Sequence, residues 1–236
     1  MTLSLHALPT KDSTTQISYQ GTAWDTERSS PAYFEERSEN YSNGKRISAH
    51  SSFKSPQSKI LGELTLDFLR NQCKLDYVYK DFRNGYEEGA IVEPTGIKTY
   101  FQDSTHSPRK EKSLQVPEPC IINGGLGEFI KMNWQNITNG KRIPFNMVVP
   151  ARLDYYRFVV FVDKKYAIQD RETGGRHCQP IVIEPKNSML AMLLPTIIMY
   201  YDVKTLRMAR YQGIVNIADD KGRSLRVRVD YPGLGP

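Results

Sequence analysis

Histidines, cysteines and activated serines are the side chains that carry nucleophilic catalysis and zinc binding, and they are sparse in this chain. The histidines lie far apart, at His6, His50, His106 and His177, with no pair at zinc-site spacing. The cysteines, Cys73, Cys120 and Cys178, form no Cys-x-x-Cys pair, and no Gly-x-Ser-x-Gly sequence is present. These patterns point to no cofactor, no metal and no catalytic residue.

Carboxylates gather around one turn. Asp81, Arg83, Glu87 and Glu88 flank Asn84-Gly85, which is a strong hairpin signal. Paired carboxylates perform general acid–base chemistry, so a hydrolase using Asp81 and Glu87 is one hypothesis. Opposite charges two residues apart more often form an ion pair of ~0–1 kcal/mol, and we favour that interpretation of Asp81 and Arg83. An enzyme is therefore the least favoured of three functions.

Aromatic residues give the leading hypothesis. The chain has 14 tyrosines, including the pairs Tyr155-Tyr156 and Tyr200-Tyr201. A tyrosine offers a flat apolar body and a hydroxyl, which suits a ligand-binding concavity. We predict that an apolar or lipid-like molecule is held by five inward-facing residues: Trp134, Tyr156, Phe158, Ile198 and Tyr200. The alternative, favoured about two to one, is that these residues form an ordinary core.

Basic residues give a second hypothesis. The formal charge is +6, and residues 121–236 carry 17 bases and 10 acids. A basic surface attracts anionic polymers. Four arginines on the last strands are the candidates: Arg207, Arg210, Arg226 and Arg228. Nucleic acid is not expected as a partner, because no Lys/Arg block of the length typical of nucleic-acid tails occurs.

The elements that must position these residues are mainly strands. Short segments rich in Tyr, Val, Ile, Phe and Thr alternate with turn residues, which is typical of antiparallel sheets. The clearest strands are 63–68, 75–83, 86–92, 97–101, 155–162, 181–184, 196–201, 206–211, 213–218 and 225–231. We predict a mainly β fold, a curved antiparallel sheet or half-barrel meander.

One helix stands out. Leu126, Phe129, Ile130, Trp134 and Ile137 follow a 3.6-residue period, so we expect one helix over 126–137 that covers the sheet. Residues 1–16 are polar and predict a loose N-terminal arm. Residues 17–236 then form a single domain, in which the apolar-poor stretch 102–119 predicts a polar excursion.

Three stretches carry a family resemblance. They are Lys59–Phe68 with Asp81–Gly89, the helix Gly124–Trp134, and the ending from Tyr201 to Tyr231. Together, over roughly half the chain, they resemble a group of secreted bacterial β-sheet proteins of unknown function. The general shape resembles that of the periplasmic lipoprotein carriers. The resemblance implies a curved sheet and an envelope location, and it implies no active-site residue.

The compartment depends on the true start of the protein. Met1 is followed by no basic region, which predicts a cytoplasmic protein if Met1 is the start. Leu3, Leu5 and Ala7 instead match the end of a signal peptide whose beginning was lost, and the location is then periplasmic or secreted. No run of about 18 apolar residues occurs, so we expect no integral membrane helix. The oligomeric state stays open.

Overall fold

The computed structural model describes residues 14–26, 30–187, 196–219 and 222–232. Its strands are β1 (Thr14–Asp25), β2 (Pro31–Ser42), β3 (Lys45–Lys54), β4 (Ile60–Asp67), β5 (Asp76–Asp81), β6 (Tyr86–Glu93), β7 (Gly96–Gln102), β8 (Lys110–Leu114), β9 (Cys120–Ile122), β10 (Ile143–Val149), β11 (Asp154–Val162), β12 (Cys178–Pro185), β13 (Ile197–Asp202), β14 (Met208–Ala218) and β15 (Ser224–Asp230). The helices are α1 (Leu126–Met132) and α2 (Trp134–Thr138), with 3₁₀ turns η1 (Asn123–Gly125), η2 (Pro150–Arg152), η3 (Lys164–Tyr166) and η4 (Asp170–Thr173).

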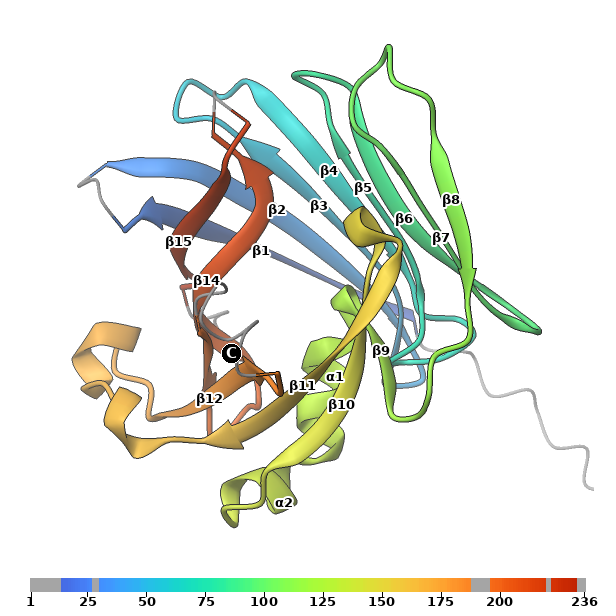
Figure 1. Cartoon of the computed structure of the whole chain (residues 1–236). Coiled ribbons are helices and arrows are strands. Elements are labelled where there is room, and N and C mark those ends of the chain that lie inside the picture. The colour runs from blue at the N-terminus through green and yellow to red at the C-terminus, as the bar shows by residue number, and fades with distance from the viewer. Residues whose placement is uncertain (1–13, 27–29, 188–195, 220–221, 233–236) are drawn as a thin grey trace, which may run out of the picture.

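All fifteen of these strands belong to one strongly curved, unclosed sheet (Figure 1). The order is β8-β7-β6-β5-β4-β3-β2-β1-β15-β14-β13-β12-β11-β10-β9, and every pair is antiparallel except β9 with β10. Two meanders, β1–β8 and β9–β15, therefore meet where β1 pairs with β15. The predicted fold, a mainly β curved antiparallel meander, is confirmed.

Turn residues explain why neighbouring strands pair in chain order. Gly85, in the predicted Asn84-Gly85 turn, has a φ of 75°, and Asn43 and Gly44 between β2 and β3 have φ values of 49° and 76°. Glycine and asparagine adopt this left-handed region at low cost, so each turn reverses the chain without strain.

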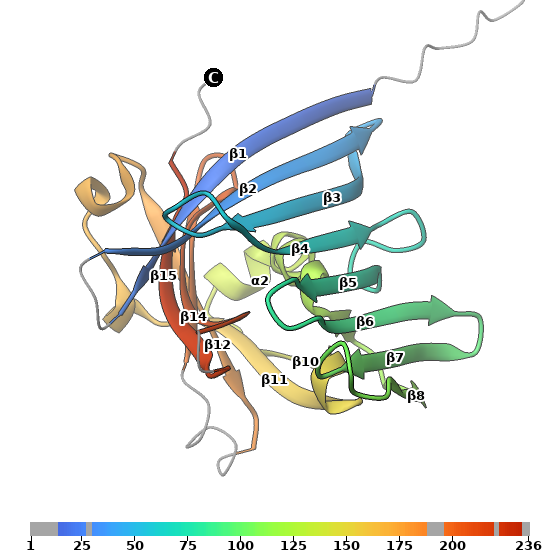
Figure 2. The same ribbon diagram turned by 90° about the horizontal axis from the view of Figure 1, so that it is seen from above.

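The sheet is so strongly curved that β9 and β10, at one end of the strand order, pack against the inner face of β4–β7, near the other end (Figures 1 and 2). Cys120, Ile122 and Val148 of β9 and β10 lie in one core with residues of β4–β7 such as Leu66 and Tyr77. The opposite face of the same strands, including Ile121, packs in a second core. The strands β9 and β10 are therefore covered on both faces, which is why they are almost continuously apolar.

The predicted helix is interrupted. The chain leaves helical geometry at Asn133, where φ is −105° and ψ is 9°, so α1 and α2 are two short helices in place of one. Phe129 and Ile137 are buried as expected against the inner face of β10–β13, whereas Trp134 is half-buried. The Asn133 amide donates to the Phe129 carbonyl (2.9 Å), a local bond that competes with a continuous helix.

Two other segments differ from the expectation. The stretch 102–119 contains β8, which pairs with β7 from Ile97–Leu114 to Phe101–Lys110. The alternation was not recognisable because β8 is an edge strand whose charged residues face water on both sides. Most of the predicted arm, with Leu3, Leu5 and Ala7, lies outside the described residues, and β1 already begins at Thr14.

No helix in the described part of the chain has the length and apolar character to cross a membrane.

Candidate functional site

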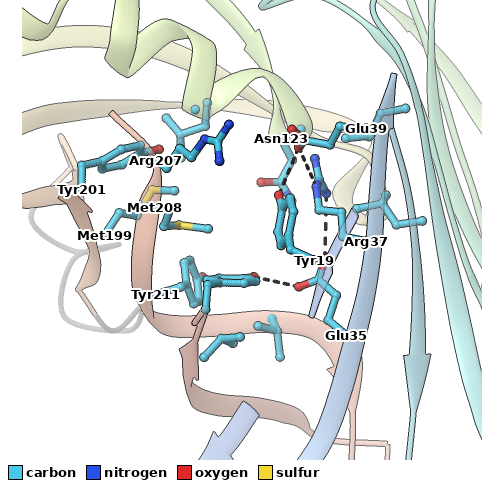
Figure 3. Close-up of a pocket in the computed structure, with 18 of the residues that line it drawn as sticks. Tyr19, Glu35, Arg37, Glu39, Asn123, Met199, Tyr201, Arg207, Met208 and Tyr211 are labelled. Carbon is cyan, nitrogen blue, oxygen red and sulfur yellow. Dashed lines mark hydrogen bonds and ion pairs between the residues drawn. The ribbon is translucent and has the colours of Figure 1, made fainter. Parts of the chain in front are cut away.

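A cavity of about 410 Å³ lies on the concave side of the sheet. One wall is the inner face of β1–β3, the opposite wall is formed by β13 and β14, and η1 with the first residues of α1 covers it (Figure 3). Residues from both ends of the chain thus meet here, because the β1–β15 pairing brings the two meanders together. A second cavity, beside the β6–β7 turn, is smaller, at about 290 Å³.

A charged row lines the first wall. Glu35, Arg37 and Glu39 alternate along β2 and all line the cavity, opposite Gly21, Tyr19 and Ile17 of β1. Successive side chains on a strand point to opposite faces, so this spacing places all three on the concave face. Glu35 and Glu39 are only 6% and 5% exposed. Charges this deeply buried need partners.

Glu39 receives hydrogen bonds on both carboxylate oxygens. The Arg37 Nε (2.8 Å) and the Tyr19 hydroxyl (3.1 Å) donate to Oε1. The Tyr41 hydroxyl donates to Oε2 (2.7 Å), and an Arg46 guanidinium nitrogen lies 3.3 Å from it. Burial alone would raise the pKa of Glu39, but Arg37 and Arg46 outweigh burial and lower it to about 2. Glu39 is therefore ionised at neutral pH.

The network continues to both sides of Glu39. Glu35 accepts from the Tyr231 hydroxyl and from Ser51 Oγ, each at 2.7 Å. Arg46 also pairs with Glu128 of α1 at 3.0 Å. Burial would lower the pKa of Arg37, yet Tyr19, Glu39 and Glu35 together raise it. The ion pair between Arg46 and Glu128 thus joins the sheet wall to the helix that covers the cavity.

The second wall is apolar and adaptable. Met199 and Tyr201 of β13 and Met208 and Tyr211 of β14 face the cavity (Figure 3). Trp134 supports this wall from behind, with its ring 6.0 Å from that of Tyr201 in an edge-on arrangement. Methionine side chains adjust to irregular ligands. The cavity thus has one hydrogen-bonded wall and one flexible apolar wall.

A further buried carboxylate, Glu88, lies next to the cavity and binds two of its lining residues, Tyr77 and Asn216. Glu88 of β6 accepts from the hydroxyls of Tyr77 (2.8 Å) and Tyr86 (2.9 Å) and from the Asn216 amide (2.8 Å). Burial raises the pKa of Glu88 despite these bonds. The neighbouring Tyr79 also lines the cavity, and its buried hydroxyl has no hydrogen-bond partner within the described ranges.

Replacing Tyr79 with phenylalanine is expected to raise the free energy of unfolding by about 1 kcal/mol, because a buried donor without a partner is costly. Tyr77→Phe is the matched control and is expected to lower it by ~1–3 kcal/mol, since Glu88 loses a donor. Urea denaturation of both variants measures the difference. Equal losses in the two variants would contradict this assignment.

The five residues predicted to hold a ligand are not brought together in the cavity. Phe158 stacks on Phe145 in the second core with a centroid distance of 5.8 Å, and Tyr156 packs at its edge. Ile198 and Tyr200 lie on the opposite face of β13 from Met199 and Tyr201, and the Tyr200 hydroxyl donates to Gln212 (3.2 Å). The predicted inward orientation is therefore wrong for Ile198 and Tyr200, whereas Phe158 and Tyr156 belong to the core that α1 and α2 cover. Because β13 is buried on both faces, its apolar pattern could not decide which face points inward.

The four candidate arginines are divided between two faces. Arg210 and Arg228 both bind Asp230, at 2.6 and 3.0 Å. Arg226 is exposed on the same face, two residues before Arg228. Arg207 instead lines the cavity. The predicted four-arginine surface is therefore not formed as one patch, and two of its members are neutralised.

The polar cluster at the Asn84-Gly85 turn is also divided. Asp81 accepts from Arg83 Nε (2.9 Å), so the predicted ion pair is confirmed. Glu87 lies opposite Lys80 and points away from the face that carries Asp81 and Glu88. The two carboxylates proposed for a hydrolase are thus on opposite sides of the sheet. Among the described residues, no group of three or more potential ligands could hold a metal ion.

The charged row of β2 was missed by the sequence analysis. The alternation that would have identified it is present in the sequence. Glu35, Arg37, Glu39 and Tyr41 alternate with Glu36, Ser38 and Asn40, which are also polar. Charged positions in a strand are normally assigned to water, so neither series indicated an inner face. Only the pairing of Tyr19 with Arg37 and Ser51 on the neighbouring strands shows which side is concave.

Comparisons with known proteins support the fold alone. No family model matches the chain, and no curated protein matches it. One similar solved structure is the β-barrel-like protein of domain of unknown function DUF1849 from Brucella abortus. It has a TM-score of 0.52 and 14% identity over 93% of this chain and 98% of that one. The chain thus shares the architecture of a bacterial β-barrel-like protein of unknown function.

Proposed function

We propose that this protein is a non-catalytic binding protein that holds a lipid-like molecule in the cavity between β2 and β13–β14. The observation that carries the proposal is the cavity itself, at about 410 Å³. Small-molecule sites typically have ~300–1,000 Å³, and ordinary protein interiors leave few voids larger than a water molecule. A concave site of this size is therefore a place for a ligand.

The lining supports an amphipathic occupant. Met199, Met208 and Tyr211 offer apolar contact on one side, whereas Arg37 and Glu39 present bonded polar groups on the other. Because these polar groups already bind one another, an apolar chain that enters the cavity does not leave them without hydrogen-bond partners. The cost of filling the cavity is therefore small compared with the gain from burying the chain, about 0.8 kcal/mol per methylene.

The expected envelope location and the resemblance to lipoprotein carriers belong to the same proposal. A curved sheet that holds an acyl chain on its concave side suits a carrier between membranes. A hydrolase is not proposed, because Asp81 and Glu87 lie on opposite faces.

The test uses the uncharged dye N-phenylnaphthylamine and native mass spectrometry. The protein is expected to raise the fluorescence of the dye and to retain a lipid through purification. Met208→Trp fills the cavity and is expected to reduce dye affinity at least tenfold, because the tryptophan occupies the volume that the ligand needs. Met132→Trp is the control, since Met132 is 72% exposed and lies outside the cavity.

The proposal fails if the protein neither raises the fluorescence of the dye nor retains a lipid through purification. It also fails if Met208→Trp and Met132→Trp bind the dye equally well while both remain folded by circular dichroism.

A further inference from the structure

More cationic than anionic side chains line the cavity, and this excess bears on the chemistry of the ligand. Eight ionisable Lys, Arg, Asp and Glu side chains line it, five cationic and three anionic: Glu35, Arg37, Glu39, Arg46, Lys131, Arg176, Asp202 and Arg207. All three carboxylates are engaged. Asp202, the one outside β2, accepts from the Lys204 amide (2.9 Å) and the Thr205 hydroxyl (3.0 Å). Each lining carboxylate thus already accepts hydrogen bonds from donors of the protein.

Three of the five cations are also engaged. Arg37 and Arg46 bind Glu39, and Lys131 binds Glu128 at 3.1 Å. The Arg176 guanidinium donates to the carbonyls of Thr173 (2.7 Å) and Tyr231 (2.6 Å), and no carboxylate of the described residues is in ion-pair contact with it. These four side chains are therefore fixed in place by the protein.

Arg207 differs from the other four. Its guanidinium has no hydrogen bond or ion pair within the described ranges, although its side chain lines the cavity. Arg207 is an exposed residue that directly precedes Met208, the partner of Tyr201 in the β13–β14 pairing, and its side chain extends toward Asn123 (Figure 3). A guanidinium presents several donors in a planar fork that matches an oxyanion. Among the described residues that line the cavity, Arg207 therefore offers a guanidinium group without a protein partner, next to the apolar wall.

We propose that the ligand is an amphiphile with an anionic head group, bound by Arg207 while its apolar chain lies against Met199, Met208 and Tyr211. This rests on the proposed function and names the chemistry of its ligand. Arg176 lines the same cavity, where the electrostatic influence of Asp202 partly offsets its charge. Burial of the ligand's apolar chain provides the affinity, and the contact between its head group and Arg207 fixes its orientation.

The test compares laurate with lauryl alcohol, which has the same chain and no charge. Both are measured by displacement of N-phenylnaphthylamine from the full chain. Laurate is expected to bind at least tenfold more tightly than the alcohol. Arg207→Gln is expected to remove this preference, because one hydrogen bond to a charged group is lost, while the alcohol binds as before. Arg207→Lys is expected to keep part of the preference, and high salt to weaken laurate binding only.

Arg226→Gln is the matched control, because Arg226 is an exposed arginine outside the cavity lining. Equal affinities for laurate and the alcohol, or an unchanged preference in Arg207→Gln, would overturn the head-group assignment and leave the proposed function standing. If neither amphiphile nor the dye binds the wild-type protein, both proposals are overturned.

Discussion

Arg37→Met is expected to lower the free energy of unfolding by about 3–5 kcal/mol, the cost of removing one partner from a buried ion pair. The Arg37 side chain is 13% exposed and lies between Glu35 and Glu39, so its loss leaves two buried carboxylates close together. Equilibrium urea denaturation at neutral pH measures the change. Lys98→Met is the control and is expected to cost below ~1 kcal/mol, because Lys98 and Glu111 form a solvent-exposed pair.

The pH dependence of this loss identifies its cause. The pKa of Glu39 is lowered from 4.5 to about 2 in the folded protein, so its stabilisation is present above pH 4.5 and is lost as pH falls through 2. Protonated carboxylates no longer need Arg37. The difference between the wild type and Arg37→Met is therefore expected to shrink between pH 5 and pH 2. A difference that does not change with pH would show that Arg37 acts only through packing.

Gly125→Ala is expected to be the second strongly destabilising change, at ~1–3 kcal/mol or more. The backbone conformation of Gly125 is helical, with φ −87° and ψ −6°, so alanine is not excluded by its dihedral angles. A Cβ atom, however, would lie 2.2 Å from the Cys73 carbonyl oxygen and 2.7 Å from its Cα. Backbone atoms cannot rotate away, so η1 must move off the loop between β4 and β5.

Gly127→Ala, two residues later, is the matched control. Its Cβ would meet only the Tyr201 hydroxyl, at 3.4 Å, and alanine gains ~0.8–1 kcal/mol of helix propensity over glycine. Thermal unfolding is expected to place Gly127→Ala at or above the wild type and Gly125→Ala well below it. Similar melting temperatures for the two variants would mean that η1 does not depend on its contact with Cys73.

The hairpins of the fold were predictable from local sequence because turn chemistry is local. Asn84-Gly85 and the alternation of Leu225, Val227 and Val229 identify elements that the structure contains. The helix break at Asn133 was not predictable, because the apolar period continues from Phe129 to Ile137 across it. That period records which residues face the core, and it does not record whether the backbone between them is continuous.

The candidate site was harder to predict because it depends on the roll of the sheet. Tyr200 and Tyr201 are both buried, and only the pairing of β13 with β14 decides that Tyr201 faces the cavity. Arg207 was predicted from the sequence as one of four anion-binding candidates, but its separation from Arg226 and Arg228 follows from the geometry between β13 and β14. Long-range pairing of this kind leaves no local pattern in the chain.

The order of the strands has a consequence for how the molecule assembles. Apart from one pair, every antiparallel neighbour in the sheet is also a neighbour in the sequence, whereas Thr22–Asp25 of β1 must find Val227–Asp230 of β15. Closing a loop of about 200 residues has an entropic cost that local hairpins avoid, and contacts of this separation form slowly. We therefore expect two independently nucleated half-sheets that join late along this short seam, and the cavity does not exist until they have joined.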